Sequence, residues 1–317
     1  MKKLLLLVTF VYLIGNAMSF TDEEPQVINI NYSASDSNNE FMVKMYNVLA
    51  NDEKQDNIFF SPFSISSALA MTFAGSDGNT EVEMANALEF SSNTESFHKN
   101  FSKVTNKINE IGKKGKVKLS IANSLWLQDG YTFKDKFINI GKKYYSAEIE
   151  NLNFSESEKS RQIINKWVES KTNDKIKNLI PKGILDALTR LVLTNAVYFK
   201  GEWKEEFKKK STQDNLFYTF KDKEVLVKMM FHKARYGYFE NDKFQFLEMA
   251  YKGDDVSMFV LLPKEKKGLF AIEKTLDMKL IDSAIKEIKK QEVKVYFPKF
   301  KINLSYELSK LMKNLGM

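Results

Sequence analysis

Residues 57–71, with the sequence NIFFSPFSISSALAM, join a short apolar strand to the start of a helix. Ser61 suits the N-cap position, where a side-chain oxygen accepts a hydrogen bond from a free backbone N–H group. Pro62 suits the first helical turn, and Ile65 and Leu69 then recur at helical spacing. The stretch therefore predicts a helix that begins at Pro62 and buries one apolar stripe.

Helical periodicity dominates the first half of the chain on both sides of this stretch. Apolar residues recur at helical spacing over 41–49, 97–111, 133–144 and 163–176. Val117, Leu119 and Ile121 alternate with polar residues, which is typical of a half-buried strand. We expect a helix-rich first half that contains one such strand.

Short β-prone runs replace the helices in the second half, separated by charged or glycine-containing turns. They cover 191–199, 215–220, 225–231, 234–240, 245–251 and 256–262. Two short helices at 269–276 and 279–288, a strand at 293–297 and a last helix over 304–315 follow. Helices and strands that are segregated along the chain indicate an α+β fold, and no repeat or linker divides it.

The N-terminus has the pattern of an export signal. Residues 1–19 combine a charged start at Lys2 and Lys3, an apolar run and a small-residue cleavage site. A membrane anchor is the competing interpretation, but the apolar run is shorter than the ~20 residues that a bilayer requires. We expect a secreted, extracellular protein with a signal peptide at 1–19, a flexible segment at 20–40, a single domain at 41–317 and no membrane partner.

The composition limits how such a secreted chain is stabilised and what it binds. It has no cysteine, so packing must replace disulfides. The formal net charge is +7, with lysines scattered among almost as many carboxylates, as on an ordinary solvated surface. In an exported chain without a nucleic-acid-binding motif, this charge favours a sulfated glycan over nucleic acid as a partner.

Four closely spaced lysines are the candidate glycan-binding residues: Lys113, Lys114, Lys116 and Lys118. They lie where a helix is expected to end and a strand to begin, so their charges add. Lysine also favours helix C-termini and polar strand faces when no ligand is present, and that interpretation stays open.

Four Asn-x-Ser/Thr sequons are candidate N-glycosylation sites: Asn31, Asn100, Asn153 and Asn303. Asn303 is the weakest candidate because it adjoins an apolar helical pattern. Such short motifs also arise by chance, so we expect two or three of the four to be used.

The sequence offers little for catalysis. It has two histidines, His98 and His232, and it has neither a Gly-x-Ser-x-Gly nor a His-Glu-x-x-His motif. We expect His98 on the exposed side of its helix, and two isolated histidines do not make a metal site. The sequence therefore predicts no catalytic residues, no metal, no cofactor and no enzymatic activity.

Seven strings, in this order along the chain, resemble the serpin family of serine protease inhibitors. They are NIFFSPFSISSALAM at 57–71, NSLWLQ at 123–128, INKWVESKTNDKI at 164–176, LVLTNAVYFKGEW at 191–203, VKMMF at 227–231, FVLLPKE at 259–265 and VYFPKFKI at 295–302. Asp174 departs from the glycine usual in the family, which affects only a local turn. The resemblance runs from about residue 41 to 317 and implies helices packed around three mainly antiparallel sheets.

The resemblance also implies structural roles for four residues. Ser61, Ser64 and Asn195 correspond to the shutter, the region beneath the large central sheet where its strands part, and Trp203 corresponds to the breach. Small serines let strands move over a helix, and an asparagine exchanges hydrogen bonds as they do so. Each residue alone also fits as an ordinary cap or core polar group, and it is the ordered set that favours the family role.

The family mechanism implies a serine protease as partner. The protease cleaves an exposed loop and is held as an acyl-enzyme while the freed loop inserts between the third and fifth strands of the central sheet. The resemblance places the fifth strand, the other C-terminal strands and the reactive bond beyond Met317. We therefore predict a suicide-substrate inhibitor in the full-length form and no inhibition by these 317 residues alone.

A non-inhibitory binding or storage protein on the same scaffold is the alternative. A bulky or proline-rich hinge cannot enter a sheet, so the hinge of the loop would separate the two functions. That hinge is not within these residues.

Overall fold

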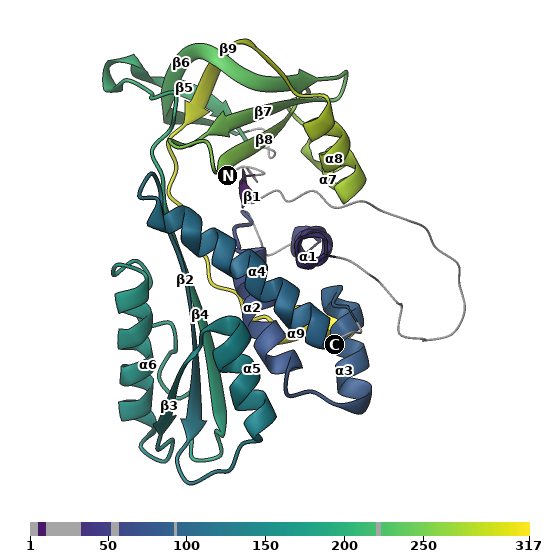
Figure 1. Ribbon diagram of the computed structural model, residues 1–317. Helices are drawn as coiled ribbons and strands as arrows, with labels where there is room; N and C mark the ends of the chain where they lie inside the picture. Colours follow the sequence, from purple (N-terminus) through teal and green to yellow (C-terminus); the bar gives the residue numbers. More distant parts are fainter. Residues whose placement is uncertain (1–5, 11–32, 52–56, 92–93, 220–222) are drawn as a thin grey trace, which may run out of the picture. The chain divides into compact units, whose positions relative to one another are not determined.

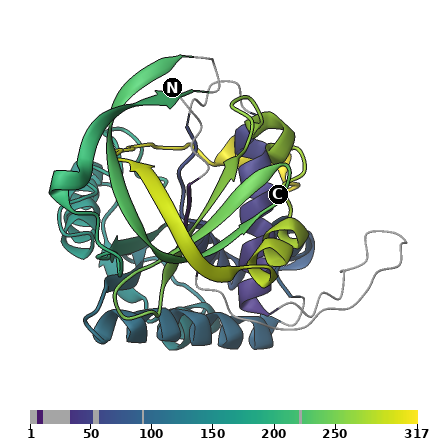
Figure 2. The same cartoon turned by 90° about the horizontal axis from the view of Figure 1, so that it is seen from above.

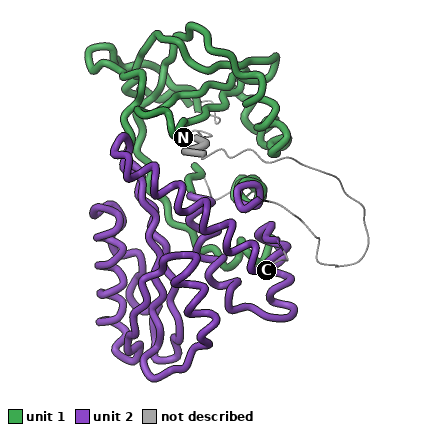
Figure 3. The backbone as a smooth tube through the Cα atoms, in the orientation of Figure 1, with its two compact units in different colours: residues 1–14, 39–60, 201–315 green, residues 15–38, 61–200, 316–317 purple. Residues whose placement is uncertain are grey.

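The computed structural model describes residues 6–10, 33–51, 57–91, 94–219 and 223–317. They divide into two compact units (Figure 3): the first comprises 1–14, 39–60 and 201–315, and the second 15–38, 61–200 and 316–317. The domain that we expected at 41–317 thus contains two units, each assembled from separate stretches of chain. Because no linker marks a division of this kind, composition does not reveal it.

The second unit packs helices on both faces of a three-stranded sheet with the order β3-β2-β4 (Figure 1). The strands are β2 (Lys118–Gln128), β3 (Glu148–Leu152) and β4 (Leu191–Lys200). The helices are α2 (Pro62–Phe73), α3 (Gly78–Leu88), α4 (Thr94–Lys113), α5 (Asp135–Tyr145) and α6 (Ser157–Lys171). β3 runs parallel to β2, whereas β4 runs antiparallel to it.

Alternate side chains of β2 face different helices, as the two-residue period of a strand requires. Trp126 packs with Ile164, Trp167 and Val168 of α6 in a buried apolar cluster. Leu125 faces α5, where a Cβ atom added to Gly141 would lie 2.8 Å from its Cδ1 atom. The helix α5 therefore packs closely on β2, and a side chain at Gly141 would require Leu125 to shift.

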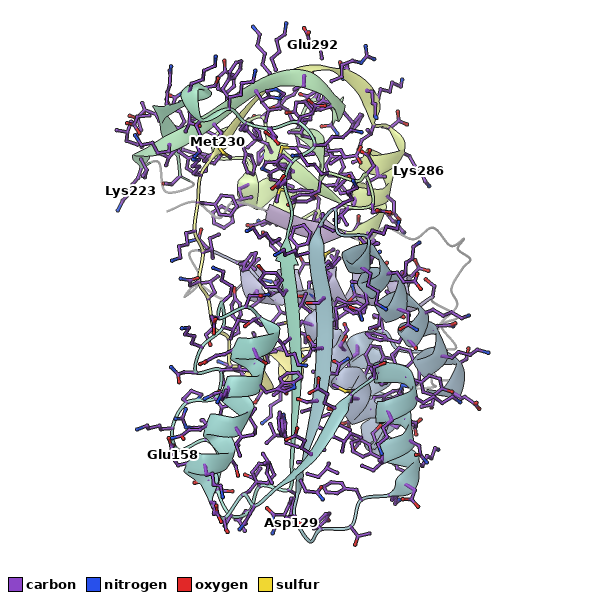
Figure 4. All side chains as sticks on the ribbon, turned by 60° about the vertical axis from the view of Figure 1, so that its left-hand side comes forward. Asp129, Glu158, Lys223, Met230, Lys286 and Glu292 are labelled. Carbon is purple, nitrogen blue, oxygen red and sulfur yellow. The ribbon has the colours of Figure 1, made fainter. Side chains whose placement is uncertain are left out.

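An ion pair on α6 holds the segment that connects α6 to β4. Glu158, labelled in Figure 4, accepts two hydrogen bonds from the guanidinium group of Arg161, at 2.9 and 2.7 Å. Arg161 Nη1 also donates to the carbonyl oxygen of Ile180 over 3.0 Å. In the turn after this helix Asp174 adopts a φ of 58°. This left-handed conformation explains why the family has glycine at that position.

The first unit is built around a six-stranded sheet with the order β1-β8-β7-β6-β5, in which β9 also pairs with β6. Its strands are β1 (Leu6–Phe10), β5 (Thr212–Tyr218), β6 (Glu224–Glu240), β7 (Phe244–Ala250), β8 (Ser257–Pro263) and β9 (Lys289–Pro298). Its helices are most of α1 (Ala34–Ala50), α7 (Leu269–Glu273), α8 (Met278–Lys286) and α9 (Ser309–Asn314), with a 3-10 turn at Lys209–Ser211. Figure 2 looks onto this sheet, with the yellow β9 beside β6.

The α+β class is confirmed, but the described residues form two sheets where we expected three. The reason is that β6 is one continuous strand rather than the two runs at 225–231 and 234–240. It pairs with β5 over 224–230, with β9 over 229–238 and with β7 over 237–240. A single long strand thus replaces the two separate strands that the pattern indicated.

Three helix boundaries differ from expectation. α1 begins at Ala34 rather than near residue 41, because a hydrogen-bonded turn between Ser33 and Asp36 starts it before the apolar pattern begins. α6 ends at Lys171, and α9 covers only Ser309–Asn314 of the expected 304–315. Of the predicted flexible segment at 20–40, residues 20–32 lie outside the described chain.

Candidate functional site

Two asparagines face each other in the middle of the sheet of the second unit. Asn123 of β2 lies directly opposite Asn195 of β4, and Asn195 Nδ2 donates to Asn123 Oδ1 over 2.7 Å. Asn123 is only 3% exposed. A buried cross-strand amide pair of this kind is stabilising only while each group keeps its partner.

The start of helix α2 supplies the next contact. Ser61 caps the helix as expected, since its Oγ atom accepts from the backbone N–H of Ser64 over 3.2 Å. The hydroxyl group of Ser64 donates to Asn195 Oδ1. Three of the four residues singled out in the sequence therefore come together, with Ser61 fixing the helix start and Ser64 joining the helix to β4.

Asn123 extends the contact toward α5. Its Nδ2 atom donates to the backbone carbonyl oxygen of Tyr145, the last residue of α5, over 2.9 Å. Sequence reasoning did not single out Asn123, although it begins the NSLWLQ string. Its role depends on the β2–β4 register, and no local pattern specifies that register.

The opposite face of the same strand pair carries a second buried polar group. The hydroxyls of Ser124 and Thr194 are hydrogen-bonded to each other, and Trp126 Nε1 donates to Thr194 Oγ1 over 3.0 Å. Within the described chain β4 pairs with β2 alone, so its other edge carries no strand.

Trp203 lies in the first unit, where it packs on the turn that follows β7. Its ring stacks on that of Tyr251 with centroids 4.4 Å apart, and the two residues form an isolated antiparallel bridge. Ion pairs flank this stack: Lys252 Nζ lies 2.8 Å from Glu202, and Lys204 Nζ lies 2.7 Å from Asp254. The carboxylates beside Lys252 raise the pKa of its amine above the ordinary value.

The two histidines occupy different environments. His98 was expected on the exposed side of its helix, and this prediction was wrong: the side chain is 1% exposed because α5 covers that face of α4. Burial, together with the charge of Lys136, lowers the pKa of His98 to about 4. His232 lies within β6, where its Nδ1 atom is 3.0 Å from the hydroxyl oxygen of Tyr236.

The part of the chain that the structure describes contains no group of three histidine, aspartate or glutamate side chains that could hold a metal ion. Nor does any helix within the described ranges have the length and apolar character needed to cross a membrane.

All four lysines that were singled out as candidate glycan-binding residues are exposed. Lys113 ends α4, Lys114 and Lys116 lie in the turn that follows, and Lys118 begins β2. Gly115 adopts a φ of 75° in this turn, a conformation that favours glycine.

Three of the four sequons lie within the described residues. Asn153 and Asn303 are exposed and Asn100 is half-buried on α4, while Asn31 lies outside the described chain. The Oδ1 atom of Asn153 accepts from both the backbone N–H and the hydroxyl of Ser155, at 3.1 and 2.6 Å.

Comparison with known proteins identifies relatives over most of the chain. Residues 36–317 match the family described as "Serpin (serine protease inhibitor)". An uncharacterized serpin-like protein of Methanosarcina acetivorans is 38% identical over 291 residues, which cover 90% of this chain and 68% of that protein. The leukocyte elastase inhibitor of the horse, Equus caballus, is 39% identical over 292 residues, which cover 89% of this chain and 76% of the inhibitor.

Solved structures show the same fold. The structure titled "Cleaved Serpin 42Da" superposes with a TM-score of 0.83 at 31% identity, covering 89% of this chain and 75% of that one. Emu ovalbumin superposes with a TM-score of 0.84 at 28% identity, covering 90% and 78%. The seven strings that resemble the family, the observed fold and these relatives agree: the chain belongs to the serpin family.

Proposed function

We propose that this chain is part of a secreted inhibitor of serine proteases that acts by inserting its cleaved loop into the central sheet. The observation that carries the proposal is the β2–β4 pair, in which Asn195 is hydrogen-bonded to Ser64 and Asn123. In the family mechanism the cleaved loop enters the sheet beside this strand and gains main-chain hydrogen bonds there. The name of the horse relative, leukocyte elastase inhibitor, supports an elastase-like protease as target.

In this proposal the chain acts as scaffold and trap, not as a catalyst. The protease attacks a loop outside residues 1–317, and its own serine becomes acylated. β4 then receives the freed loop, while Asn195 and Ser64 keep the sheet joined to α2 through short side chains that adjust to strand movement. Under this proposal residues 1–317 alone are expected not to inhibit.

The test is the formation of a covalent complex. Residues 1–317 and a longer form that continues past Met317 are incubated with elastase, trypsin and chymotrypsin and examined by denaturing electrophoresis. The longer form should give a stable adduct with at least one protease and none with the same protease lacking its active-site serine. An adduct with residues 1–317 would refute the assignment of the reactive bond.

A non-inhibitory binding or storage role remains the alternative function. The fold is shared about equally with the cleaved serpin and with emu ovalbumin, so structural similarity does not separate the two functions. Cleavage of the longer form as an ordinary substrate, without any adduct, would support this alternative and contradict inhibition.

Secretion is proposed from the sequence of residues 1–19. The structure describes residues 6–10 as β1, paired antiparallel with β8, and cleavage after Ser19 would remove that strand. N-terminal sequencing of the protein from culture medium should begin at Phe20. Recovery of the intact N-terminus from inside cells would contradict secretion.

A sulfated glycan is the proposed second partner, and neither nucleic acid nor membrane is proposed. Its candidate residues are the exposed lysines at 113, 114, 116 and 118. If the protein passes through a eukaryotic secretory route, Asn153 and Asn303 are the sequons best placed for glycosylation, because both are exposed.

A further inference from the structure

His98 is the one histidine of the second unit, and it lies in a box of aromatic rings. The ring of Phe97 lies 5.3 Å from it and that of Tyr145 lies 5.6 Å away, both edge-on. Tyr144 and Phe73 complete the box, each with its centroid 6.1 Å away. Rings from α2, α4 and α5 thus exclude water from the imidazole.

The hydrogen bonding of this imidazole suits only its neutral form. His98 Nδ1 is 2.7 Å from the hydroxyl oxygen of Tyr145, whereas Nε2 is buried and has no partner among the described residues. A neutral imidazole has one N–H group, but an imidazolium has two, and each needs an acceptor. With its proton on Nδ1 the neutral ring donates to Tyr145 and leaves no N–H unsatisfied, whereas protonation in place would add a buried Nε2–H without an acceptor and cost free energy.

The charged groups around His98 do not compensate for a second proton. Lys136 of α5 opposes it by like charge. Lys143 lies over the outer face of the Tyr144 ring, 4.7 Å from its centroid, and interacts with Glu95, one turn before His98 on α4. From α2 the uncharged ring of Phe73 contacts His98. Burial first, and Lys136 second, accordingly lower the pKa of His98 to about 4.

Tyr145 connects this box to the paired asparagines. Its hydroxyl is hydrogen-bonded to His98, and its backbone carbonyl oxygen accepts a hydrogen bond from Asn123 Nδ2. Asn123 in turn accepts a hydrogen bond from Asn195. Tyr145 is 1% exposed and ends α5, which packs closely on β2 through Gly141 and Leu125. A movement that breaks the His98–Tyr145 contact therefore displaces an acceptor of the β2–β4 network.

We propose that His98 is an acid-sensitive lock on this sheet: protonation drives its ring out from between α4 and α5 and thereby loosens α5 and the Asn123–Asn195 pair. No protease or loop is needed for this step, so the inference stands apart from the inhibitory function. The lock gives the sheet of the second unit a means of opening at acidic pH.

The direction of the pH effect follows from linkage. In the opened state the imidazole has its ordinary pKa of 6.5, and in the closed state the pKa is about 4. Between these values the opened state binds more protons, so stability contributed by neutral His98 is present above pH 6.5 and is lost as the pH falls. Within this window the equilibrium constant for opening should rise about tenfold for each unit by which the pH falls.

Amide hydrogen exchange of the full chain tests the lock. Exchange of peptides covering 118–128 and 191–200 is followed from pH 7.5 to 4.5 and corrected for the intrinsic rate. Two variants remove the titration differently: His98→Asn keeps a polar partner for Tyr145, and His98→Phe keeps a ring in the box. His232→Asn is the matched control, because it removes the other histidine, which lies in the first unit.

Opening in the parent chain should accelerate about tenfold per pH unit below 6.5 relative to the His98 variants, and His232→Asn should follow the parent. Equal acceleration in the parent and in the His98 variants would overturn the proposal. If neither variant folds, NMR titration of the His98 ring in the His232→Asn chain decides. A pKa well below 6.5 supports the lock, and an ordinary pKa overturns it.

Discussion

Asn195 lies directly opposite Asn123 across the β2–β4 pair, and a partly buried hydrogen bond of 2.7 Å joins their amides. Ser64 donates to the amide oxygen of Asn195, so one side chain joins a helix to two strands. Because every partner in this network is itself hydrogen-bonded, the loss of one member leaves several groups unsatisfied.

Asn195→Ala should lower the free energy of unfolding of the second unit by about 2 kcal/mol, since it strands the buried Asn123 oxygen and the Ser64 hydroxyl. Urea unfolding followed by tryptophan fluorescence measures this. In a Trp203→Phe background the remaining tryptophans, Trp126 and Trp167, report on that unit alone.

Asn106→Ala is the control for this measurement, because Asn106 is exposed on α4 and its replacement should change stability by less than about 0.5 kcal/mol. Asn123→Ala combined with Asn195→Ala should cost less than the sum of the two single changes. Strict additivity would show that the two amides are not coupled.

Gly112 near the end of α4 permits no side chain. A Cβ atom there would lie 1.8 Å from the carbonyl oxygen of Leu119, which is backbone of β2 and cannot rotate away. Gly112→Ala should therefore destabilise the second unit by more than about 3 kcal/mol, although alanine favours a helix interior by about 1 kcal/mol. Thermal unfolding measures the loss, with the exposed Lys107→Ala as the control on the same helix.

The stack of Trp203 on Tyr251 should stabilise the first unit through a specific ring contact. A double-mutant cycle with Trp203→Ala and Tyr251→Ala is expected to give a coupling energy of about 0.5–1.5 kcal/mol. Urea unfolding followed by circular dichroism measures each corner of the cycle. A coupling energy of zero would mean that Trp203 acts only through its backbone bridge to Tyr251.

Local signals were sufficient for much of the scaffold. Ser61 and Pro62 predicted the start of α2, and Ser61 indeed caps it, because capping involves neighbours three residues apart. β6 was divided wrongly at His232 and Lys233, which look like a polar interruption. β9 pairs with both residues and keeps the strand continuous, and that pairing spans some sixty residues of sequence.

Local sequence patterns also failed to identify part of the candidate site. Ser64 and Asn195 were found through the resemblance, whereas Asn123 and Tyr145 depend on the register of β2 with β4 and on the position of α5. His98 was misplaced because it adjoins the apolar stripe of α4 without belonging to it, and rings of α2 and α5 help to bury it. The burial and the hydrogen-bond partners of such residues depend on tertiary contacts, not on the periodicity of the sequence.

The exposed lysines after α4 give a last prediction. Replacing Lys113, Lys114 and Lys116 by serine should lower affinity for a heparin-like sulfated polysaccharide about tenfold, if each exposed charge contributes about 0.5 kcal/mol. Binding should also become less sensitive to salt, because fewer charges are screened. Affinity measured at two salt concentrations separates this effect from a change in fold.

Lys208, Lys209 and Lys210 provide the matched control, since they are equally exposed and their replacement by serine removes the same net charge. This triple change lies in the first unit and should leave affinity nearly unchanged. If both triple variants weaken binding equally, the polysaccharide responds to net charge alone. A loss confined to the lysines at 113, 114 and 116 requires a local site, because the two variants then differ only in where the charge was removed.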